Sequence, residues 1–210
     1  MKVISIILAR GGSKGLPNKN ILKINNKPLI SYSIEASLNS KYISKTIVSS
    51  DSQEIIDISK RCGAEILKRS ENLSGDEITS ETVISNVLDN ISNIDGYDYL
   101  VLLQPTSPLR NEKHIDEAFE IVFNAQADSL ISCKKIDNAP LKAFMLDKNN
   151  YLTGISNNTY PFMRRQDLPP LFMPNGAIYI SRVKEFKKNS TLFSEKTMMY
   201  EMDNNSSIDI

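Results

Sequence analysis

Short apolar runs alternate along this chain with segments in which apolar residues recur every three or four positions. The first run, VISIIL at 3–8, is apolar at nearly every position, which is typical of a strand buried on both faces. The segment 79–91 instead has the apolar spacing of a helix. The pattern predicts strands at 3–8, 45–50, 64–67, 97–103, 129–133 and 175–181, and helices at 29–38, 54–62, 79–91 and 114–123.

The order of these elements predicts a doubly wound α/β fold with a mainly parallel sheet. Asp51 or Ser52 is expected to cap the helix at 54–62, and Gly63 to end it. The alternation breaks between about 137 and 174, which holds five of the nine prolines and no long helical pattern. We therefore predict one domain over 1–210 with an inserted flap at about 137–174.

The charge balance, the apolar runs and the cysteine spacing disfavour several classes of function. The chain has 210 residues with 25 basic and 25 acidic side chains, so a nucleic-acid partner held by a general basic surface is not expected. No apolar run approaches the roughly 18 residues of a membrane span, so no membrane partner is expected either. Cys62 and Cys133 lack metal-ligand spacing. We interpret them as reduced core thiols, which suits a cytoplasmic protein.

The loop ARGGSKGLPNKN at 9–20 follows the first predicted strand, where ligands bind in open α/β sheets. Its glycines let backbone N–H groups approach a ligand closely, and its cations suit a polyphosphate. It matches neither the Walker A pattern nor G-x-G-x-x-G, so a nicotinamide cofactor is disfavoured. A solvated basic turn is the alternative interpretation. The candidate residues are Arg10, Gly11, Gly12, Lys14, Gly15 and Lys19.

A second loop, LLQPTSPLR at 102–110, follows the most apolar predicted strand. Its two prolines stiffen the backbone and fix the directions of Gln104, Thr106, Ser107 and Arg110. A rigid polar loop at a strand end suits recognition of a hydroxylated ligand. A simple strand-to-helix turn would leave the same pattern.

The remaining candidates are more isolated. In PNGAIYI at 174–180, Asn175 is either a turn former or a ligand contact. Arg164 and Arg165, with Lys142, suit a substrate carboxylate, although such a pair is commonly only solvated.

Asp209 and His114 are single candidate residues outside these segments. Asp209 could ligate a hard cation such as Mg²⁺ through oxygen, although a lone carboxylate usually has no such role. His114 lies on a predicted helix without a nucleophile signature nearby, and we interpret it as a structural or surface residue.

Taken together, these segments resemble the acylneuraminate cytidylyltransferases over essentially the whole chain. LARGGSKGLPNKN is similar to the family's nucleotide-binding signature, LLQPTSPLR to its second motif, MPNGAIYI to its third and SIDI to its closing motif. The resemblance implies a Rossmann-like nucleotidyltransferase fold with a small inserted dimerisation subdomain. It also implies transfer of CMP from CTP to the anomeric hydroxyl of a nine-carbon acid sugar, with release of pyrophosphate, by a Mg²⁺-dependent homodimer.

The resemblance also assigns site residues. Residues of the first motif would hold and neutralise the triphosphate, and others would bind the cytidine, the sugar and the metal ion. Two cations of the insertion would reach the sugar carboxylate of the partner subunit's site. The assignments are catalytic Arg10, Lys14 and Lys19; nucleotide-binding Arg10, Gly11, Gly12, Asn20, Arg69 and Ser80; sugar-binding Gln104, Lys142, Arg165, Asn175, Tyr179 and Phe193; and metal-binding Asp209.

The sequence departs from the family pattern at two places. The pattern continues to a second aspartate two residues after Asp209, whereas the sequence ends at Ile210. If both carboxylates are needed, weak metal binding is expected. Leu192 stands where relatives can carry a second aromatic residue, which bears on the choice of sugar.

Several functional alternatives stay open. N-acetylneuraminate is the first choice of sugar, with legionaminate or pseudaminate next. A CMP-octulosonate synthetase and a nucleotide- or sugar-binding module with impaired catalysis are the other possibilities. No general base can be identified from the sequence.

Overall fold

The computed structural model describes residues 1–12, 15–75 and 77–210. Its centre is a seven-stranded sheet in the order β11-β7-β10-β6-β1-β4-β5, with two small two-stranded sheets beside it. The strands are β1 (Val3–Leu8), β2 (Lys23–Ile24), β3 (Lys27–Pro28), β4 (Ile43–Ser50), β5 (Glu65–Lys68), β6 (Tyr99–Leu102), β7 (Ser129–Ile136), β8 (Phe144–Leu146), β9 (Leu152–Gly154), β10 (Leu171–Arg182) and β11 (Thr197–Glu201).

The central sheet is mainly parallel, as the sequence predicts. β1 pairs in parallel with β4 and β6, β4 with β5, and β7 with β11. Only β10 runs antiparallel to its neighbours β6 and β7 within the described part of the sheet. The carboxyl ends of β1, β4, β5 and β6 therefore meet at one edge, where ligands bind in folds of this class.

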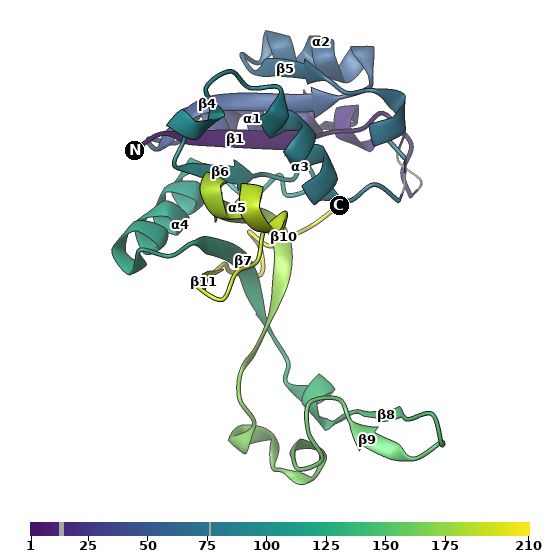
Figure 1. The fold of residues 1–210 in the computed structure, drawn as a ribbon. Helices are drawn as coiled ribbons and strands as arrows, with labels where there is room; N and C mark the ends of the chain where they lie inside the picture. Colours follow the sequence, from purple (N-terminus) through teal and green to yellow (C-terminus); the bar gives the residue numbers. More distant parts are fainter. Residues whose placement is uncertain (13–14, 76) are drawn as a thin grey trace.

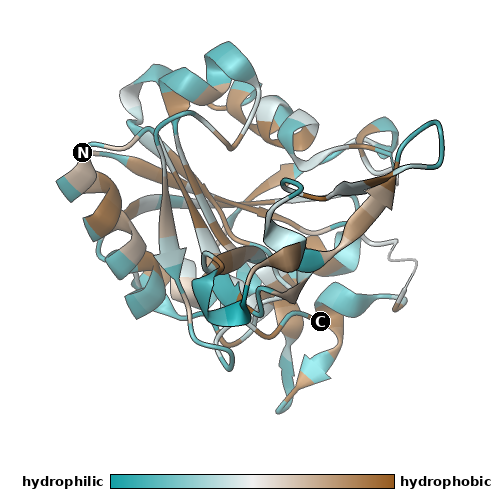
Figure 2. Cartoon of the chain, turned by 90° about the horizontal axis from the view of Figure 1, so that it is seen from below, coloured by the Kyte–Doolittle hydropathy of each residue, from teal (hydrophilic) through white to brown (hydrophobic). Residues whose placement is uncertain are grey.

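Helices cover both faces of the sheet (Figure 1). One apolar cluster joins α1, α2 and α4 to the first face, and a second joins α3 and α5 to the other. Figure 2 shows apolar colour along the central strands and polar colour on the outer faces of the helices. The helices are α1 (Leu29–Asn39), α2 (Gln53–Arg61), α3 (Ser80–Asp89), α4 (Glu112–Ala125) and α5 (Val183–Asn189), with short 3-10 turns at η1 (Lys19–Ile21), η2 (Glu71–Leu73), η3 (Ile94–Gly96), η4 (Ala139–Lys142), η5 (Tyr160–Phe162) and η6 (Arg165–Asp167).

The chain between β7 and β10 leaves the body of the protein and forms a projection built around the β8–β9 hairpin (Figure 1). Several large apolar side chains on this projection are exposed, including Leu146 at 65%, Tyr151 at 72% and Phe162 at 82%. An isolated hairpin of this size buries little apolar surface of its own. The projection therefore presents an apolar surface to its surroundings.

A side chain caps the amino end of α4 but not that of α2. Asn111 caps α4, and His114 Nδ1 accepts a hydrogen bond from Asn111 N–H at 3.1 Å, so His114 has the structural role expected of it. Ser52 occupies the cap position of α2, but no side chain makes a capping hydrogen bond there. Ser52 thus takes the expected cap position without the expected side-chain bond, and Asp51 is not the cap: its carboxylate accepts a hydrogen bond from Gly11 of the loop at 9–20, called the glycine loop below.

Cys62 and Cys133 are both free thiols, as expected. Among the described helices, none combines the length and the apolar character that crossing a membrane requires.

Candidate functional site

Three adjoining cavities lie along the edge where the strands of the sheet end. The central cavity, of about 290 Å³, is lined by residues that include Arg10, Lys19 and Gln104. The arginine cavity, of about 240 Å³, contains Arg69 and shares Arg10 with the central cavity. The terminal cavity, of about 310 Å³, contains Asp209 and shares Gln104 with the central cavity. These shared residues join the three cavities into one cleft.

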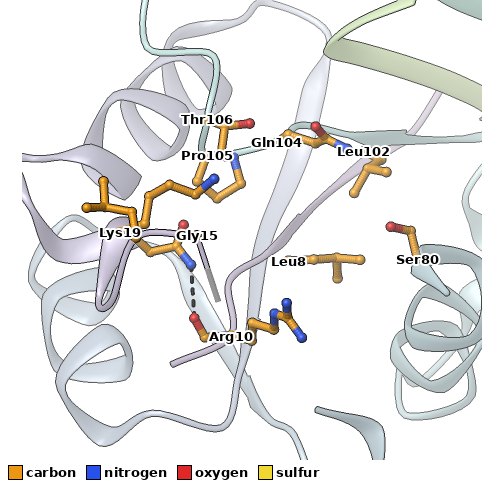
Figure 3. Close-up of a pocket in the computed structure, with 11 residues that line it drawn as sticks. Leu8, Arg10, Gly15, Lys19, Ser80, Leu102, Gln104, Pro105 and Thr106 are labelled. Carbon is orange, nitrogen blue, oxygen red and sulfur yellow. Dashed lines mark hydrogen bonds between the residues drawn. The ribbon is translucent and has the colours of Figure 1, made fainter. Parts of the chain in front are cut away.

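The central cavity is lined in part by the loop at 9–20. Figure 3 shows Arg10, Ser80 and Gln104 around a common space. Asn20 is buried and donates from Nδ2 to the Arg10 carbonyl at 3.0 Å, which fixes the backbone of the loop. Lys19 Nζ donates to the Ile210 carbonyl at 2.7 Å. The arrangement brings fixed positive charge to the end of β1, as a polyphosphate site requires.

The arginine cavity contains a buried cation. Arg69 is only 6% exposed, and its Nε and Nη2 have no hydrogen-bond partner among the described residues. Burial lowers the pKa of the Arg69 guanidinium, and the Asp51 carboxylate at 3.8 Å partly offsets that effect. Ser80, the first residue of α3, lines the same cavity. The cavity therefore offers guanidinium donors and a hydroxyl to a ligand with carbonyl oxygens.

The second predicted motif is held rigidly, although not every side chain faces the cleft. The Gln104 carbonyl accepts hydrogen bonds from Ser33 Oγ at 3.0 Å and from Arg110 Nη2 at 3.2 Å. Arg110 also donates to Ser33 Oγ at 2.6 Å and is 1% exposed, so burial lowers the pKa of its guanidinium. Ser107 is likewise buried and lines none of the three cavities. Arg110 thus supports the loop and Ser107 is buried beneath it, while Gln104 and Thr106 line the cleft.

Asn175 lies at the terminal cavity, but its side chain is committed to the protein. Its Oδ1 accepts from Ser132 Oγ at 2.6 Å, and its Nδ2 donates to Ser207 Oγ at 2.9 Å. Asn175 and Gly176 form no turn but lie at a register shift within β10, where Gly176 has a φ of 78° and an added Cβ would be 2.8 Å from Gln104 Oε1. Asn175 therefore joins β7 and β10 to the segment that carries Asp209.

Lys134 is a cation of the terminal cavity that the sequence reasoning missed. It follows directly after the predicted strand 129–133, so the rule that ligand-binding residues follow strand ends would have found it. Tyr179 lines the same cavity, and burial raises the pKa of its hydroxyl. The cavity combines a cation, a phenol, a carboxylate from Asp209 and the Gln104 amide, which suits a polar ligand that donates and accepts hydrogen bonds.

Other assigned residues lie outside this cleft. Lys142 and Arg165 are on the projection, where Lys142 Nζ donates to the Met163 carbonyl at 2.6 Å and Arg165 pairs with Asp137. Phe193 is 64% exposed and lines none of the three cavities.

The glycine loop is only partly described. Gly11 and Gly12 flank the cleft without lining a cavity, and Lys14 lies outside the described residues. The structure brings together Arg10, Lys19, Asn20, Arg69, Ser80, Gln104, Asn175, Tyr179 and Asp209.

In the described part of the chain, no three His, Cys, Asp or Glu side chains converge as a metal site. Asp209 alone offers a carboxylate to the terminal cavity. One carboxylate fits Mg²⁺, because this ion commonly takes its other ligands from substrate phosphates and water.

The curated proteins most similar in sequence include several named as cytidylyltransferases. The chain is 36% identical over 212 residues to the N-acylneuraminate cytidylyltransferase of Streptococcus agalactiae, and the match covers 100% of this chain and 50% of that protein. The chain thus spans about half the length of that relative. It is 34% identical over 212 residues to the pseudaminic acid cytidylyltransferase of Campylobacter jejuni, with 100% and 91% of the two chains covered.

Solved structures agree on the fold. A CMP:2-keto-3-deoxy-manno-octonic acid synthetase complexed with CTP superposes with a TM-score of 0.71 at 16% identity, covering 96% of this chain and 90% of the other. The 4-diphosphocytidyl-2C-methyl-D-erythritol synthase of Anaerococcus prevotii gives 0.66 at 14% identity, with 100% and 90% covered. The expected Rossmann-like nucleotidyltransferase fold is therefore confirmed.

The sequence model of the family described as cytidylyltransferase matches residues 4–208, nearly the whole chain. Together with the relatives above, this match confirms the resemblance inferred from the four motifs. The chain belongs to the cytidylyltransferase family.

Proposed function

We propose that this chain transfers CMP from CTP to the anomeric hydroxyl of a nine-carbon acid sugar and releases pyrophosphate. The observation that supports this proposal is the order of the three cavities. The arginine cavity adjoins the central cavity with its cationic loop, and the central cavity adjoins the polar terminal cavity. This order allows a base on one side and an acceptor sugar on the other to flank a phosphate group in the central cavity, as attack of the sugar on the α-phosphorus of CTP requires. N-acetylneuraminate is the first candidate, and legionaminate and pseudaminate are the next.

The nucleotide half of the cleft would act by charge. Arg10 and Lys19 would neutralise the triphosphate, together with Lys14 of the same loop. Arg69 and Ser80 would bind the cytidine part. When the sugar hydroxyl attacks the α-phosphorus, negative charge develops on the departing pyrophosphate, and fixed cations stabilise that charge without a covalent intermediate.

The sugar half of the cleft would orient the acceptor. Tyr179 and Gln104 offer hydrogen bonds inside the terminal cavity, and Asn175 holds its wall. We further propose a homodimer in which the exposed apolar projection packs against a second copy. Lys142 of the partner subunit and Arg165 of the partner subunit would then bind the sugar carboxylate, and Phe193 would border the sugar.

A magnesium ion would be held by Asp209 and by oxygens of the substrate phosphates. Bound there, it would supply Lewis-acid polarisation of a phosphoryl oxygen. We place the reaction in the cytoplasm, in keeping with the two free thiols.

The test is pyrophosphate release with CTP, Mg²⁺ and each candidate sugar in turn. Controls omit the sugar, replace CTP with UTP or ATP, or supply the eight-carbon octulosonate. Release with CTP and one nine-carbon sugar supports the proposal and names the substrate. Release only with octulosonate would replace the proposed sugar class, and tight CTP binding without release under any condition would indicate a binding module instead. Sedimentation velocity tests the dimer.

A further inference from the structure

The end of β4 fastens together two segments of the cleft that each carry an arginine. The Ser49 carbonyl accepts a hydrogen bond at 3.0 Å from the backbone N–H of the residue before Arg10. The Ser50 carbonyl accepts one at 2.8 Å from the backbone N–H of Arg69. The glycine loop and the Arg69 segment are thus attached to the last two residues of one strand, and Asp51 is the residue that follows the strand.

The side chain of Asp51 repeats this link. Its Oδ1 accepts the Gly11 N–H at 2.9 Å and lies 3.8 Å from Arg69 Nη2. The loop sits so close to this turn that a Cβ added at Gly11 would be 2.9 Å from the Cβ of Ser52. One carboxylate therefore contacts both segments, and it does so where the backbone leaves little room for another arrangement.

The charges around Asp51 are unbalanced without it. Arg69 and Arg10 line the same cavity, and the Arg69 side chain is 5% exposed while that of Asp51 is 23% exposed. Burial and the charge of Arg10 both lower the pKa of Arg69, and Asp51 acts in the opposite direction. Asp51 is thus the counter-ion of a buried cation that has a second cation nearby. Removing one partner of such a pair leaves the other charge buried and uncompensated.

We infer that Asp51 is a positioning residue that fixes the Arg69 guanidinium relative to the glycine loop and thereby contributes to the selection of a cytosine nucleotide. Asp51 lines none of the three cavities, so it acts through Arg69 and Gly11. A guanidinium discriminates between ligands by the fixed geometry of its donors, and a loosely held one loses that geometry. This inference rests on the proposed function, because it takes the arginine cavity as the site of the base.

Two substitutions separate the two contacts of Asp51. Asp51→Asn keeps an oxygen that can accept the Gly11 N–H but removes the charge beside Arg69. Asp51→Ala removes both contacts. We expect Asp51→Asn to lower the ratio of CTP to UTP affinity about tenfold, the scale of one hydrogen bond to a charged group. Asp51→Ala should lower the ratio of CTP to UTP affinity by the same factor. It should also weaken the binding of both nucleotides, because the glycine loop loses its hydrogen bond to Asp51.

The measurement is isothermal titration calorimetry of CTP and of UTP without sugar, on variants whose fold is verified by circular dichroism. Asp57→Asn is the matched control, since Asp57 is exposed on α2 and accepts a hydrogen bond from Gln53 of the same helix. The ratio of CTP to UTP affinity of Asp57→Asn should equal that of the unaltered protein.

The outcomes distinguish a failure of the role of Asp51 from a failure of the proposed function. An unchanged CTP to UTP ratio in Asp51→Asn would overturn the role of Asp51, and this variant alone carries the test if Asp51→Ala does not fold. An unaltered protein that binds UTP as tightly as CTP would overturn the proposed function and the inference with it.

Discussion

The side-chain amide of Asn175 donates a hydrogen bond to Ser207 Oγ at 2.9 Å, two residues before Asp209. Both residues are buried, at 6% and 3% exposure, and the other end of the amide accepts a hydrogen bond from Ser132. The contact ties the segment with the candidate metal ligand to the wall of the terminal cavity. A residue assigned to the sugar by its motif is therefore part of the framework that places its neighbours.

Asn175→Ala tests this framework role. It would leave buried hydroxyls of Ser132 and Ser207 with fewer partners, so we expect the free energy of unfolding to fall by about 1–3 kcal/mol. The sugar KM should rise more than the CTP KM, because only the terminal cavity is disturbed. Urea unfolding and steady-state kinetics measure the two effects. Asn204→Ala, at an exposed position of the same segment, is the control. Unchanged stability would contradict the framework role.

Arg10→Ala tests the charge at the end of β1. Removal of one fixed charge-stabilising donor commonly lowers turnover by about 100-fold or more, and we expect that loss here. The measurement is kcat for pyrophosphate release at saturating CTP. Lys23→Ala, which removes an exposed cation of β2, should leave kcat unchanged. Turnover near that of the unaltered protein in Arg10→Ala would exclude a role in catalysis.

Lys142→Ala tests the proposed contribution of the projection to a second subunit's site. Its cation would bind the sugar carboxylate, so the sugar KM should rise far more than the CTP KM. Lys148→Ala is a matched control, because Lys148 is an exposed lysine of the same projection. Equal changes in both KM values would reject the carboxylate assignment, and a monomer in sedimentation velocity would remove the argument for a shared site.

The capping histidine of α4 predicts a pH dependence of stability. Burial is the main cause that lowers the pKa of His114, opposed by nearby carboxylates that include Glu117 and Asp203. Because the folded pKa is the lower one, the unfolded chain takes up the proton first as the pH falls below about 6.5. The contribution of neutral His114 is thus fully present above that pH and is lost progressively below it.

His114→Gln isolates this effect, since glutamine can make the same capping contact without titrating. Urea unfolding at pH 7 and pH 5 should show a smaller loss of stability on acidification in the variant than in the unaltered protein. Equal losses in the two proteins would show that His114 does not contribute to the acid sensitivity.

Much of the fold could be predicted because buried parallel strands and amphipathic helices leave strong periodic signals. The helix α5 and the edge strand β11 were missed, since VKEFKKN and TMMYE are short and only partly buried. The residues that follow strand ends were correctly placed at one edge of the sheet, and Arg10, Arg69 and Gln104 do line a common cleft.

The partners of individual side chains could not be predicted. Arg110 looked like a ligand contact, yet the loop folds back so that its guanidinium reaches Ser33 of α1, 77 positions away in sequence. Asp51 looked like a helix cap, yet it accepts a hydrogen bond from Gly11, 40 positions away. Local sequence signals do not report such long-range contacts, which arise only from the packing of distant segments.

The division of the cleft along the chain has a practical consequence. The central and arginine cavities are built from residues between Leu8 and Thr106, whereas the terminal cavity, apart from Gln104, is built from residues between Lys134 and Asp209. Under the proposed function, the recognition of the donor and of the acceptor would thus be encoded in consecutive stretches of the chain that meet at a single glutamine. Exchanging the second stretch between relatives, with Gln104 retained, offers a direct route to a new acceptor with the old donor.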